Sequence, residues 1–391
     1  MSKRSDWAMK PLSEVVEIQR GFDLPHHARR PGPYPVMTSG ETGGFHDEAP
    51  VKGPGVTIGR ATNLGKPKWS AGDFWPHNTT MFVKDFKGNN PRWVFHLFEN
   101  TDLTGFDSGS VQPMLNRNYI AQVPVAVPPR NQQDAIAEVL ASLDAKIAAN
   151  TKLATTIDNY FMAIWKRLAL KAKGAVPLSD LIQSVTAGDW GLSEASVTHS
   201  ETAYCIRGSD IPALQKNKLG NMPLRHIKPN SLLKRRLAPY DLVVEMSGGS
   251  PTQSTGRAVL ITAGLLRRID GHLSSSNFCK IIRLEEPQHS MFVYGVLRNS
   301  WTKGDFFQFE NGTTGIKNLA FSDYTAMTKL SLPSQNDLCH FNGFAENIFE
   351  MLQVLGDEDV RLAEMREVLL PQLMSGSLSV KDAEKLVGTI V

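Results

Sequence analysis

The sequence predicts an α+β protein in which two β-rich globular domains are separated by two long antiparallel coiled-coil helices, with pseudo-twofold symmetry. Two observations lead to this prediction. The hexapeptide that begins at Pro11 (PLSEVV) returns in similar form at Pro177 (PLSDLI), 166 positions later (177 − 11). Each copy opens a Gly- and Asn-rich stretch that closes with a proline and a long heptad-patterned segment. Repetition of a whole unit implies two related surfaces, which suits the reading of a two-part target.

The bulk composition is that of a soluble multidomain protein. A length of 391 residues suits two or three domains, and a net charge of +3 permits a nucleic-acid partner without demanding one. Three cysteines without C-x-x-C spacing argue against structural zinc and a disulfide framework. The start of the chain has no apolar leader-like region, and no apolar run approaches the length of a membrane span. We therefore expect a reduced, soluble, cytoplasmic protein.

The first module is expected over residues 1–130. Short apolar runs such as Gly55–Gly59, separated by turn residues, are typical of strands in a β-rich α+β domain.

A coiled-coil helix is predicted over residues 131–173. Asn131, just after Pro128 and Pro129, is the expected N-cap. Lysines followed by Gly174 are typical of a helix C-terminus. Ten positions follow one another at alternating spacings of four and three, and nine of them are apolar, as in a coiled-coil seam: Ile136, Leu140, Leu143, Ile147, Asn150, Ala154, Ile157, Phe161, Ile164 and Leu168.

The second module is expected over residues 174–333. It has similar apolar runs, such as Leu242–Met246 and Arg257–Ile261. Matching landmarks at its two ends lie 166 and 205 positions after those of the first module, so it is longer by 39 residues (205 − 166). Divergence of this size is expected if the two modules bind different targets.

A second helix is predicted over residues 334–377, followed by a C-terminal tail at 378–391. Gly356 is expected to interrupt this helix. Both seams turn polar near the middle, at Asn150 and Glu358, as an antiparallel pair centred on a twofold axis would require. The alternative is two unrelated surface helices, each packed on its own domain. The second seam is Phe341, Phe344, Ile348, Met351, Leu355, Glu358, Leu362, Met365 and Leu369.

Catalytic motifs are absent from the sequence. Residues 59–66 (GRATNLGK) have the wrong glycine spacing for a phosphate-binding P-loop. Asp241 and Glu245 suggest the carboxylate pair of a metal nuclease, but Ser247 stands where such a site would use lysine. The sequence has no (Asn/Asp)-Pro-Pro-(Tyr/Phe) stretch, which argues against a resident amino-methyltransferase. The histidines lack partners at metal-ligand spacing.

These residues resemble the DNA-specificity (S) subunit of type I restriction–modification systems. Residues 128–140 (PPRNQQDAIAEVL) are similar to that family's first conserved helix, and residues 369–376 (LLPQLMSG) to its closing signature. The second helix departs from the family in lacking a second proline before it, at residues 335–338. Looser similarities to its target-recognition domains lie at residues 109–113, 245–253 with Gly256-Arg257, and 312–316.

The resemblance implies a subunit with no reaction of its own. Residues 1–130 and 174–333 would be target-recognition domains, each reading one half of a split, asymmetric sequence in double-stranded DNA. The spacer helices would set the gap, about one DNA turn between centres. They would also dock two methyltransferase (modification) subunits, which carry S-adenosylmethionine and flip an adenine. Whether two ATP-driven restriction subunits join is left open. The cofactors S-adenosylmethionine, ATP and Mg would belong to the partners, with no metal in this chain and no membrane partner.

Residues expected to contact DNA are polar or basic side chains on loops, together with glycines that let the backbone approach a phosphate. For any one of them an ordinary structural role is an open alternative. In the first module they are Arg20, Arg60, Asn63, Lys66, Lys68, His77, Asn78, Ser110 and Gln112. In the second they are Arg207, Lys216, Ser247, Gly248, Gly249, Ser250, Thr252, Gln253, Arg257, Asn277 and Lys317.

Two other functions compete with DNA recognition. A scaffold that does not bind DNA could use the coiled coil to bring other proteins together. A stand-alone nuclease could be built on Asp241 and Glu245.

Overall fold

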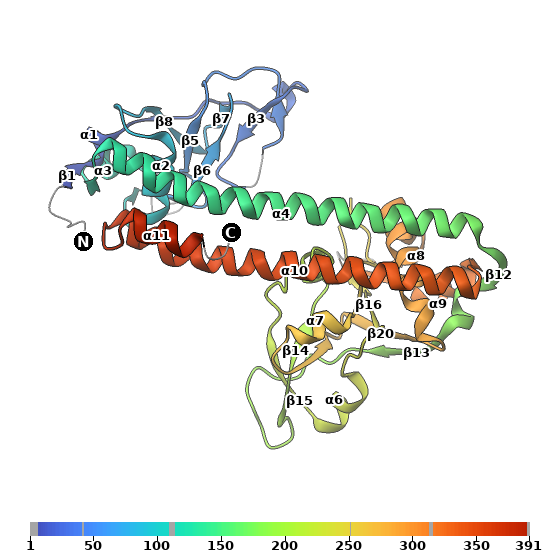
Figure 1. The fold of residues 1–391 in the computed structure, drawn as a ribbon. Coiled ribbons are helices and arrows are strands. Elements are labelled where there is room, and N and C mark those ends of the chain that lie inside the picture. Colours follow the sequence, from blue (N-terminus) through green and yellow to red (C-terminus); the bar gives the residue numbers. More distant parts are fainter. Residues whose placement is uncertain (1–6, 41–42, 109–113, 251, 313–315, 389–391) are drawn as a thin grey trace. The chain divides into compact units, whose positions relative to one another are not determined.

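The chain divides into two compact units in the computed structural model, which describes residues 7–388 apart from 41–42, 109–113, 251 and 313–315. Unit 1 comprises Met1–Ala148 with Arg361–Val391, and unit 2 comprises Ala149–Val360. The two longest helices, α4 (Arg130–Lys171) and α10 (Gln335–Met374), each contribute one part to each unit (Figure 1). The units therefore differ from the predicted linear domains, because each part of a helix packs on the module beside it.

The module of unit 1 is built on a four-stranded antiparallel sheet of order β2-β8-β5-β6: Glu17–Arg20, Thr80–Asp85, Gly55–Gly59 and Pro67–Ser70. A second sheet has the order β4-β3-β7, with β3 (Tyr34–Met37) antiparallel to β4 (Phe45–His46) and parallel to β7 (Trp75–Pro76). The other elements are β1 (Ala8–Pro11) paired with β11 (Pro124–Val127), β9 (Asp107–Ser108) paired with β10 (Met114–Leu115), α1 (Leu12–Val15), η2 (His26–Ala28), α2 (Pro91–Asn100) and α3 (Arg117–Ile120).

The module of unit 2 has a four-stranded antiparallel sheet of order β13-β20-β16-β18: Ile182–Ala187, Cys279–Leu284, Leu242–Glu245 and Ala258–Leu260. In its second sheet, β14 (Glu201–Ile206) is antiparallel to β15 (Leu224–Ile227) and parallel to β19 (His272–Ser275). Further strands are β12 (Lys173–Pro177) paired with β23 (Lys329–Leu332), and β17 (Ser247–Gly248), β22 (Lys317–Leu319) and β21 (Glu310–Asn311). The helices are η3 (Leu178–Leu181), α5 (Ile211–Gln215), α6 (Pro229–Arg235), α7 (Ala263–Arg267), η4 (Pro287–His289), α8 (Ser290–Lys303), η5 (Asp305–Phe309) and α9 (Phe321–Met327).

The two modules repeat one strand topology. In chain order β2, β3, β4, β5, β6, β7 and β8 match β13, β14, β15, β16, β18, β19 and β20, with the same neighbours and the same parallel or antiparallel sense. Helices α2 and α8 both follow the last of these strands. The internal repeat predicted from the sequence is thus confirmed. Among the described residues, α5, α6 and α7 have no counterpart in the first module, which contributes to its shorter length.

The two long helices run antiparallel within each unit. In unit 1, Asp144 accepts a hydrogen bond of 2.6 Å from Arg366, and Trp7 lies against both Gln132 and Gly376. In unit 2, Asn150 donates a hydrogen bond of 2.7 Å to Glu358, which joins the two polar midpoints. The rings of Phe161 and Phe349, farther from those midpoints, lie 5.3 Å apart. These contacts confirm the antiparallel pair and rule out two unrelated surface helices.

The helix termini and seam differ from the prediction in detail. The Pro129 carbonyl accepts the backbone hydrogen bond of Gln133 at 3.0 Å, so Pro129 is the N-cap of α4 and Asn131 lies inside the helix. Met351 is 54% exposed whereas Leu352 is 2% exposed. The buried stripe of α10 is displaced here because it packs on the module of unit 2 as well as on α4.

Gly356 does not interrupt α10, which runs unbroken past it. A Cβ atom at this position would lie 2.3 Å from the backbone oxygen of Asn217. Glycine therefore allows a loop of the module to approach the helix closely.

The segment expected to be a C-terminal tail contains a folded helix, α11 (Val380–Val387). Ser379 caps its first turn by accepting the backbone hydrogen bond of Asp382, and Ala383 and Val387 are buried in the core of unit 1. That core also holds Trp93 from α2 and seam residues of α4 and α10, so the C-terminal segment is part of the fold of unit 1.

Candidate nucleic-acid interface

Each module has one edge of its main sheet at which several loops meet, and we call this the loop edge. In the first module it comprises residues 20–22, 38, 60–61 and 77–79. In the second module it comprises residues 187–189, 207, 246–247 and 276–278. Loops held on a rigid sheet are the usual place for binding residues. Seven of the residues predicted to contact DNA lie on these edges: Arg20, Arg60, His77, Asn78, Arg207, Ser247 and Asn277.

Backbone hydrogen bonds fix the loop edge of the first module around the turn at Thr79. The Thr79 carbonyl accepts hydrogen bonds from two consecutive amides, Arg60 at 2.9 Å and Ala61 at 3.2 Å. Further bonds run from Gly21 N to Thr80 O (3.0 Å), Phe22 N to Pro76 O (2.8 Å), His77 N to Met37 O (2.9 Å) and Leu115 N to Arg60 O (2.9 Å).

The loop edge of the second module has the same hydrogen bonds at equivalent positions. The Phe278 carbonyl accepts from the amides of Met246 at 2.8 Å and Ser247 at 3.3 Å. The others are Gly188 N to Cys279 O (3.1 Å), Asp189 N to Ser275 O (2.9 Å), Ser276 N to Ile206 O (2.9 Å) and Leu319 N to Met246 O (2.8 Å). The two edges are therefore one backbone frame built twice, and their side chains can be compared position by position.

A glycine is required at one point of this frame. A Cβ atom on Gly21 would lie 2.2 Å from the carbonyl oxygen of His77, and a Cβ atom on Gly188 would lie 2.2 Å from that of Ser276. In each module, any larger residue would push the loop that holds this glycine away from the turn at Thr79 or Phe278.

Arg20 and Arg60 place uncompensated positive charge on the first loop edge. Neither forms an ion pair with any residue that the structure describes. Burial, followed by the charge of Arg20, lowers the pKa of the Arg60 guanidinium. Burial, followed by the charge of Arg29, lowers the pKa of His77 as well. Cations without a carboxylate partner are suited to bind an external anion such as a phosphate.

Asn63 and Asn78 mainly brace this edge. The Asn63 amide donates to the Ser39 carbonyl at 2.9 Å, and Ser39 Oγ lies 2.7 Å from Thr62 Oγ1. The Asn78 amide donates to the carboxylate of Asp23.

The two predicted lysines of the first module have different surroundings. The Lys68 ammonium donates to the carbonyl of Thr38 at 2.8 Å and to that of Gly40, so it holds the loop after β3. Lys66 is exposed near Asp102. Hydrogen bonds from Thr104, and to a smaller extent the charge of Lys66, lower the pKa of Asp102.

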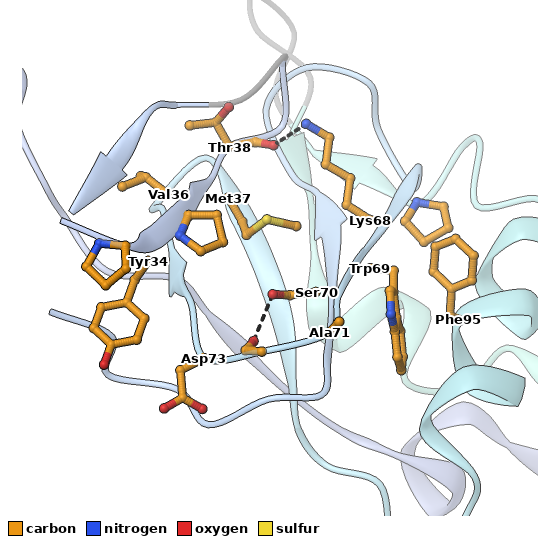
Figure 2. A pocket seen from close by; sticks show the side chains of 14 residues that line it. Tyr34, Val36, Met37, Thr38, Lys68, Trp69, Ser70, Ala71, Asp73 and Phe95 are labelled. Carbon is orange, nitrogen blue, oxygen red and sulfur yellow. Dashed lines mark hydrogen bonds between the residues drawn. The ribbon is translucent and has the colours of Figure 1, made fainter. Parts of the chain in front are cut away.

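Lys68 also lies in the wall of an open hollow of about 990 Å³ between β3 and β6. Figure 2 shows Trp69 and Phe95 on the side of Lys68, with Tyr34 and Asp73 farther round the wall. Thr38 belongs both to this hollow and to the loop edge. The hollow thus adjoins the candidate interface and offers it an aromatic wall.

The described residues of the serine-rich loop of the second module, 247–250 and 252–255, are anchored to one another and to their neighbours. Ser250 and Gln253 exchange backbone hydrogen bonds, with Ser250 N to Gln253 O at 2.8 Å. Ser247 Oγ donates to Asn318 Oδ1 at 2.5 Å. Thr252 is exposed. Gly248 and Gly249 have φ of +145° and +77°, in the region that favours glycine.

Three predicted cations of the second module are paired with carboxylates. Arg257 forms two hydrogen bonds with the buried Glu245, at 2.8 and 2.6 Å. Arg207 likewise holds Asp210, at 2.9 Å for both bonds. The Lys317 ammonium binds Glu310 Oε2 at 2.8 Å and the Ser250 carbonyl at 3.0 Å. These side chains organise the module, and less of their charge is available to DNA.

Asn277 and Lys216 remain as exposed candidates in the second module. Asn277 lies on the loop edge, and its side chain forms no hydrogen bond within the described parts of the chain. Lys216 lies at the end of α5. Ser110 and Gln112, predicted for the first module, lie outside the described residues. DNA contact by each of these residues stays a prediction.

The sequence reasoning missed Phe278. Its side chain is 52% exposed at the position equivalent to Thr79. The one available signal was the shared asparagine of the two turns, Asn78 and Asn277, each one residue before this position.

The carboxylates of the nuclease alternative are both neutralised. Asp241 accepts two hydrogen bonds from Arg283, at 3.0 and 3.1 Å, and Glu245 is held by Arg257. The first precedes β16 and the second ends it, so they lie at opposite ends of one strand. Over the described ranges, no three His, Cys, Asp or Glu side chains gather as a metal site. None of the helices in those ranges combines the length and the apolar content needed to cross a bilayer.

Comparisons with known proteins were made for the whole chain. Residues 4–159, less than half of it, match the family model described as "Type I restriction modification DNA specificity domain". The S subunit of a type I restriction-modification system from M. genitalium is 12% identical, with 94% of this chain and 96% of that chain covered and a TM-score of 0.57. The HsdS subunit from Thermoanaerobacter tengcongensis is also 12% identical, with 95% and 97% covered and a TM-score of 0.34. No curated protein matches the sequence.

The domain match and the fold shared with the M. genitalium subunit confirm the predicted resemblance and fold class.

Proposed function

The chain carries the DNA specificity domain of type I restriction–modification systems, and from that premise we propose that it is the subunit that reads a bipartite DNA target. The matched DNA specificity domain and the fold shared with the M. genitalium subunit support this function. Neither favours a scaffold that does not bind DNA. The observation that carries the bipartite reading is the backbone frame of the loop edge, which is built twice with different side chains. Two frames of one geometry can read two half-sites, and different side chains make the halves different.

The spacer helices are the proposed docking surface for methyltransferase subunits. In the parts of α4 and α10 that belong to unit 2, large apolar side chains remain exposed although the opposite faces of the helices are packed. Exposed apolar side chains on a helix are typical of a surface that a partner covers. They are Leu153, Tyr160, Met351 and Val354.

The chemistry then belongs to the partners. S-adenosylmethionine would be bound by two methyltransferase subunits, and ATP and Mg by restriction subunits where a system has them. This chain would bind no cofactor and catalyse no reaction of its own, and it would act on DNA in the cytoplasm. Support for this comes from the specificity domain and from the arginines that hold Asp241 and Glu245.

Methylation mapping of DNA from cells that express this chain with its methyltransferase partner tests the proposal. We expect a split asymmetric motif with one modified adenine in each half. Exchange of residues 177–332 for the equivalent part of a relative should change one half of the motif and leave the other half and the gap intact. If no modified motif depends on this chain, the proposed function is wrong. If both halves change, the modules do not read independently.

A further inference from the structure

We propose that the two loop edges contact DNA by different chemistry, the first through the charges of Arg20 and Arg60 and the second through Phe278 and Asn277 at an A·T base pair. This inference rests on the proposed function, since it assumes that both edges face DNA. It deepens that function by assigning a kind of contact to each module.

The equivalent positions of the two frames differ in charge. Where the first edge has Arg20 and Arg60, the second has Ala187 and Met246, and Met246 is buried in the core. Two positions on the second edge carry a charge. Arg207 is positive and Asp189 is negative, so their charges cancel. Arg207 is also held by Asp210. The first edge therefore carries free positive charge that the second lacks at the same points.

Arg20 and Arg60 lie on both sides of the start of β8. Arg20 is paired with Met81 in the β2–β8 ladder, and Arg60 N is bonded to the Thr79 carbonyl. Strands β2 and β5 are the two neighbours of β8, and Arg20 and Arg60 are level with residues two apart on β8. The arginine backbones therefore lie about 12 Å apart, two strand spacings across and two residues along. Two free guanidinium groups at this separation suit contacts to the DNA backbone, whose phosphates provide most of the salt-dependent affinity.

Phe278 lies on the second edge with its backbone fixed and its side chain free. Its carbonyl accepts two hydrogen bonds, which hold the turn, while the ring remains half exposed. A phenyl ring cannot bind a phosphate, but it can contact the methyl group of thymine or the face of a base. An exposed aromatic ring at the centre of a polar loop cluster therefore indicates a base contact.

The neighbouring Asn277 supplies the matching polar group. Its amide is exposed and unpartnered among the described residues, whereas the equivalent Asn78 amide is bound to Asp23. An asparagine amide forms two hydrogen bonds with adenine in the major groove, and apolar side chains contact thymine. An amide and an apolar ring on adjacent residues thus suit one A·T pair in the half-site that the second module reads.

The salt dependence of binding separates the two kinds of contact. The experiment uses the complex of the full chain with its methyltransferase subunits, and measures Kd for target and non-target duplexes over a range of salt. The Arg20→Gln/Arg60→Gln variant should lower the slope of log K against log salt by about 0.9 for each phosphate that the protein no longer neutralises, with little change in the preferred sequence. Arg117→Gln, an exposed arginine of α3 that is not one of the loop-edge residues, is the matched control.

Phe278→Ala should weaken binding to the target by about 5- to 100-fold, leave the salt slope unchanged, and relax the methylated motif at one A·T pair. Asn277→Ala should relax the same position. Leu233→Ala removes an exposed apolar side chain of α6 and is the control. The relaxed pair should fall in the half that exchange of residues 177–332 changes.

The proposal is overturned if the arginine variant keeps the wild-type slope, or if Phe278→Ala lowers target and non-target affinity equally. Thermal melting of each variant shows whether weaker binding reflects unfolding. A wild-type complex that binds target and non-target DNA alike would refute the proposed function itself, before any variant is compared.

Discussion

Replacing Gly356 by alanine should destabilise unit 2, although glycine in the middle of a helix is ordinarily unfavourable. Alanine in a helix interior is favoured over glycine by about 0.8–1 kcal/mol. From sequence alone Gly356→Ala should therefore stabilise α10 by that amount. In the structure the added Cβ atom would lie 2.3 Å from Asn217 O, a distance at which neither backbone can remain in place.

The expected magnitude follows from what must move. To reach an ordinary contact of 3.4 Å, the Asn217 carbonyl must retreat by about 1 Å. That carbonyl accepts a hydrogen bond of 2.8 Å from Arg268 Nη1, and a bond to a charged group contributes about 1.5–3 kcal/mol. Overpacking typically costs about 1–3 kcal/mol. The two costs together are about 2.5–6 kcal/mol. After the gain of about 0.8–1 kcal/mol in helix propensity, we expect a net destabilisation of about 1.5–5 kcal/mol. The loop that moves carries Lys216, so DNA affinity should fall with stability.

Gly343→Ala in the same helix is the matched control. Nothing lies within 4 Å of a Cβ atom there, so this variant should be stabilised by about 0.8–1 kcal/mol. Calorimetry should show opposite shifts in Tm, roughly 2–4 °C for each kcal/mol in a unit of this size. Hydrogen exchange of peptides covering residues 212–220 should rise in Gly356→Ala alone. Equal stabilisation of both variants would refute the close approach.

Three further predictions concern polar groups in the core and at the surface. Burial, only partly offset by Glu99, lowers the pKa of His96 below its ordinary 6.5. The unfolded chain therefore takes up this proton more readily, and stability should fall as the pH drops below about 6.5. His96→Gln should make the difference in Tm between pH 7.5 and 5.5 smaller, and an unchanged difference would contradict the assignment. Asn150→Ala removes the hydrogen bond to the Glu358 carboxylate, so the urea midpoint should fall by the equivalent of about 1.5–3 kcal/mol; a midpoint within error of wild type would show that this bond contributes nothing. Cys339 is exposed and should react quickly with a thiol reagent at pH 8, whereas rapid reaction of all three thiols would contradict the burial that raises the pKa of the other two, Cys205 and Cys279, to about 12.

The residues predicted to bind DNA show why charge could be read from the sequence but its availability could not. Arg60 comes directly after β5 and Arg257 directly before β18, so both are loop arginines at the end of a strand. Arg257 is neutralised by Glu245, which faces it from the neighbouring strand β16, while Arg60 has Arg20 near it. Which charges are cancelled depends on groups brought together by the sheet.

By itself, the sequence determined the duplication of the modules, the two long helices and their antiparallel pairing. Heptad spacing and repeated motifs are properties of the chain that need no knowledge of distant contacts, and the polar midpoints Asn150 and Glu358 marked the register. Tertiary structure alone decided that Gly356 admits a neighbouring carbonyl, that residues 380–387 join a core, and that Thr79 and Phe278 occupy one position in a frame built twice. Each of these depends on atoms from strands and loops far apart in the chain, whose separation in space no local pattern records.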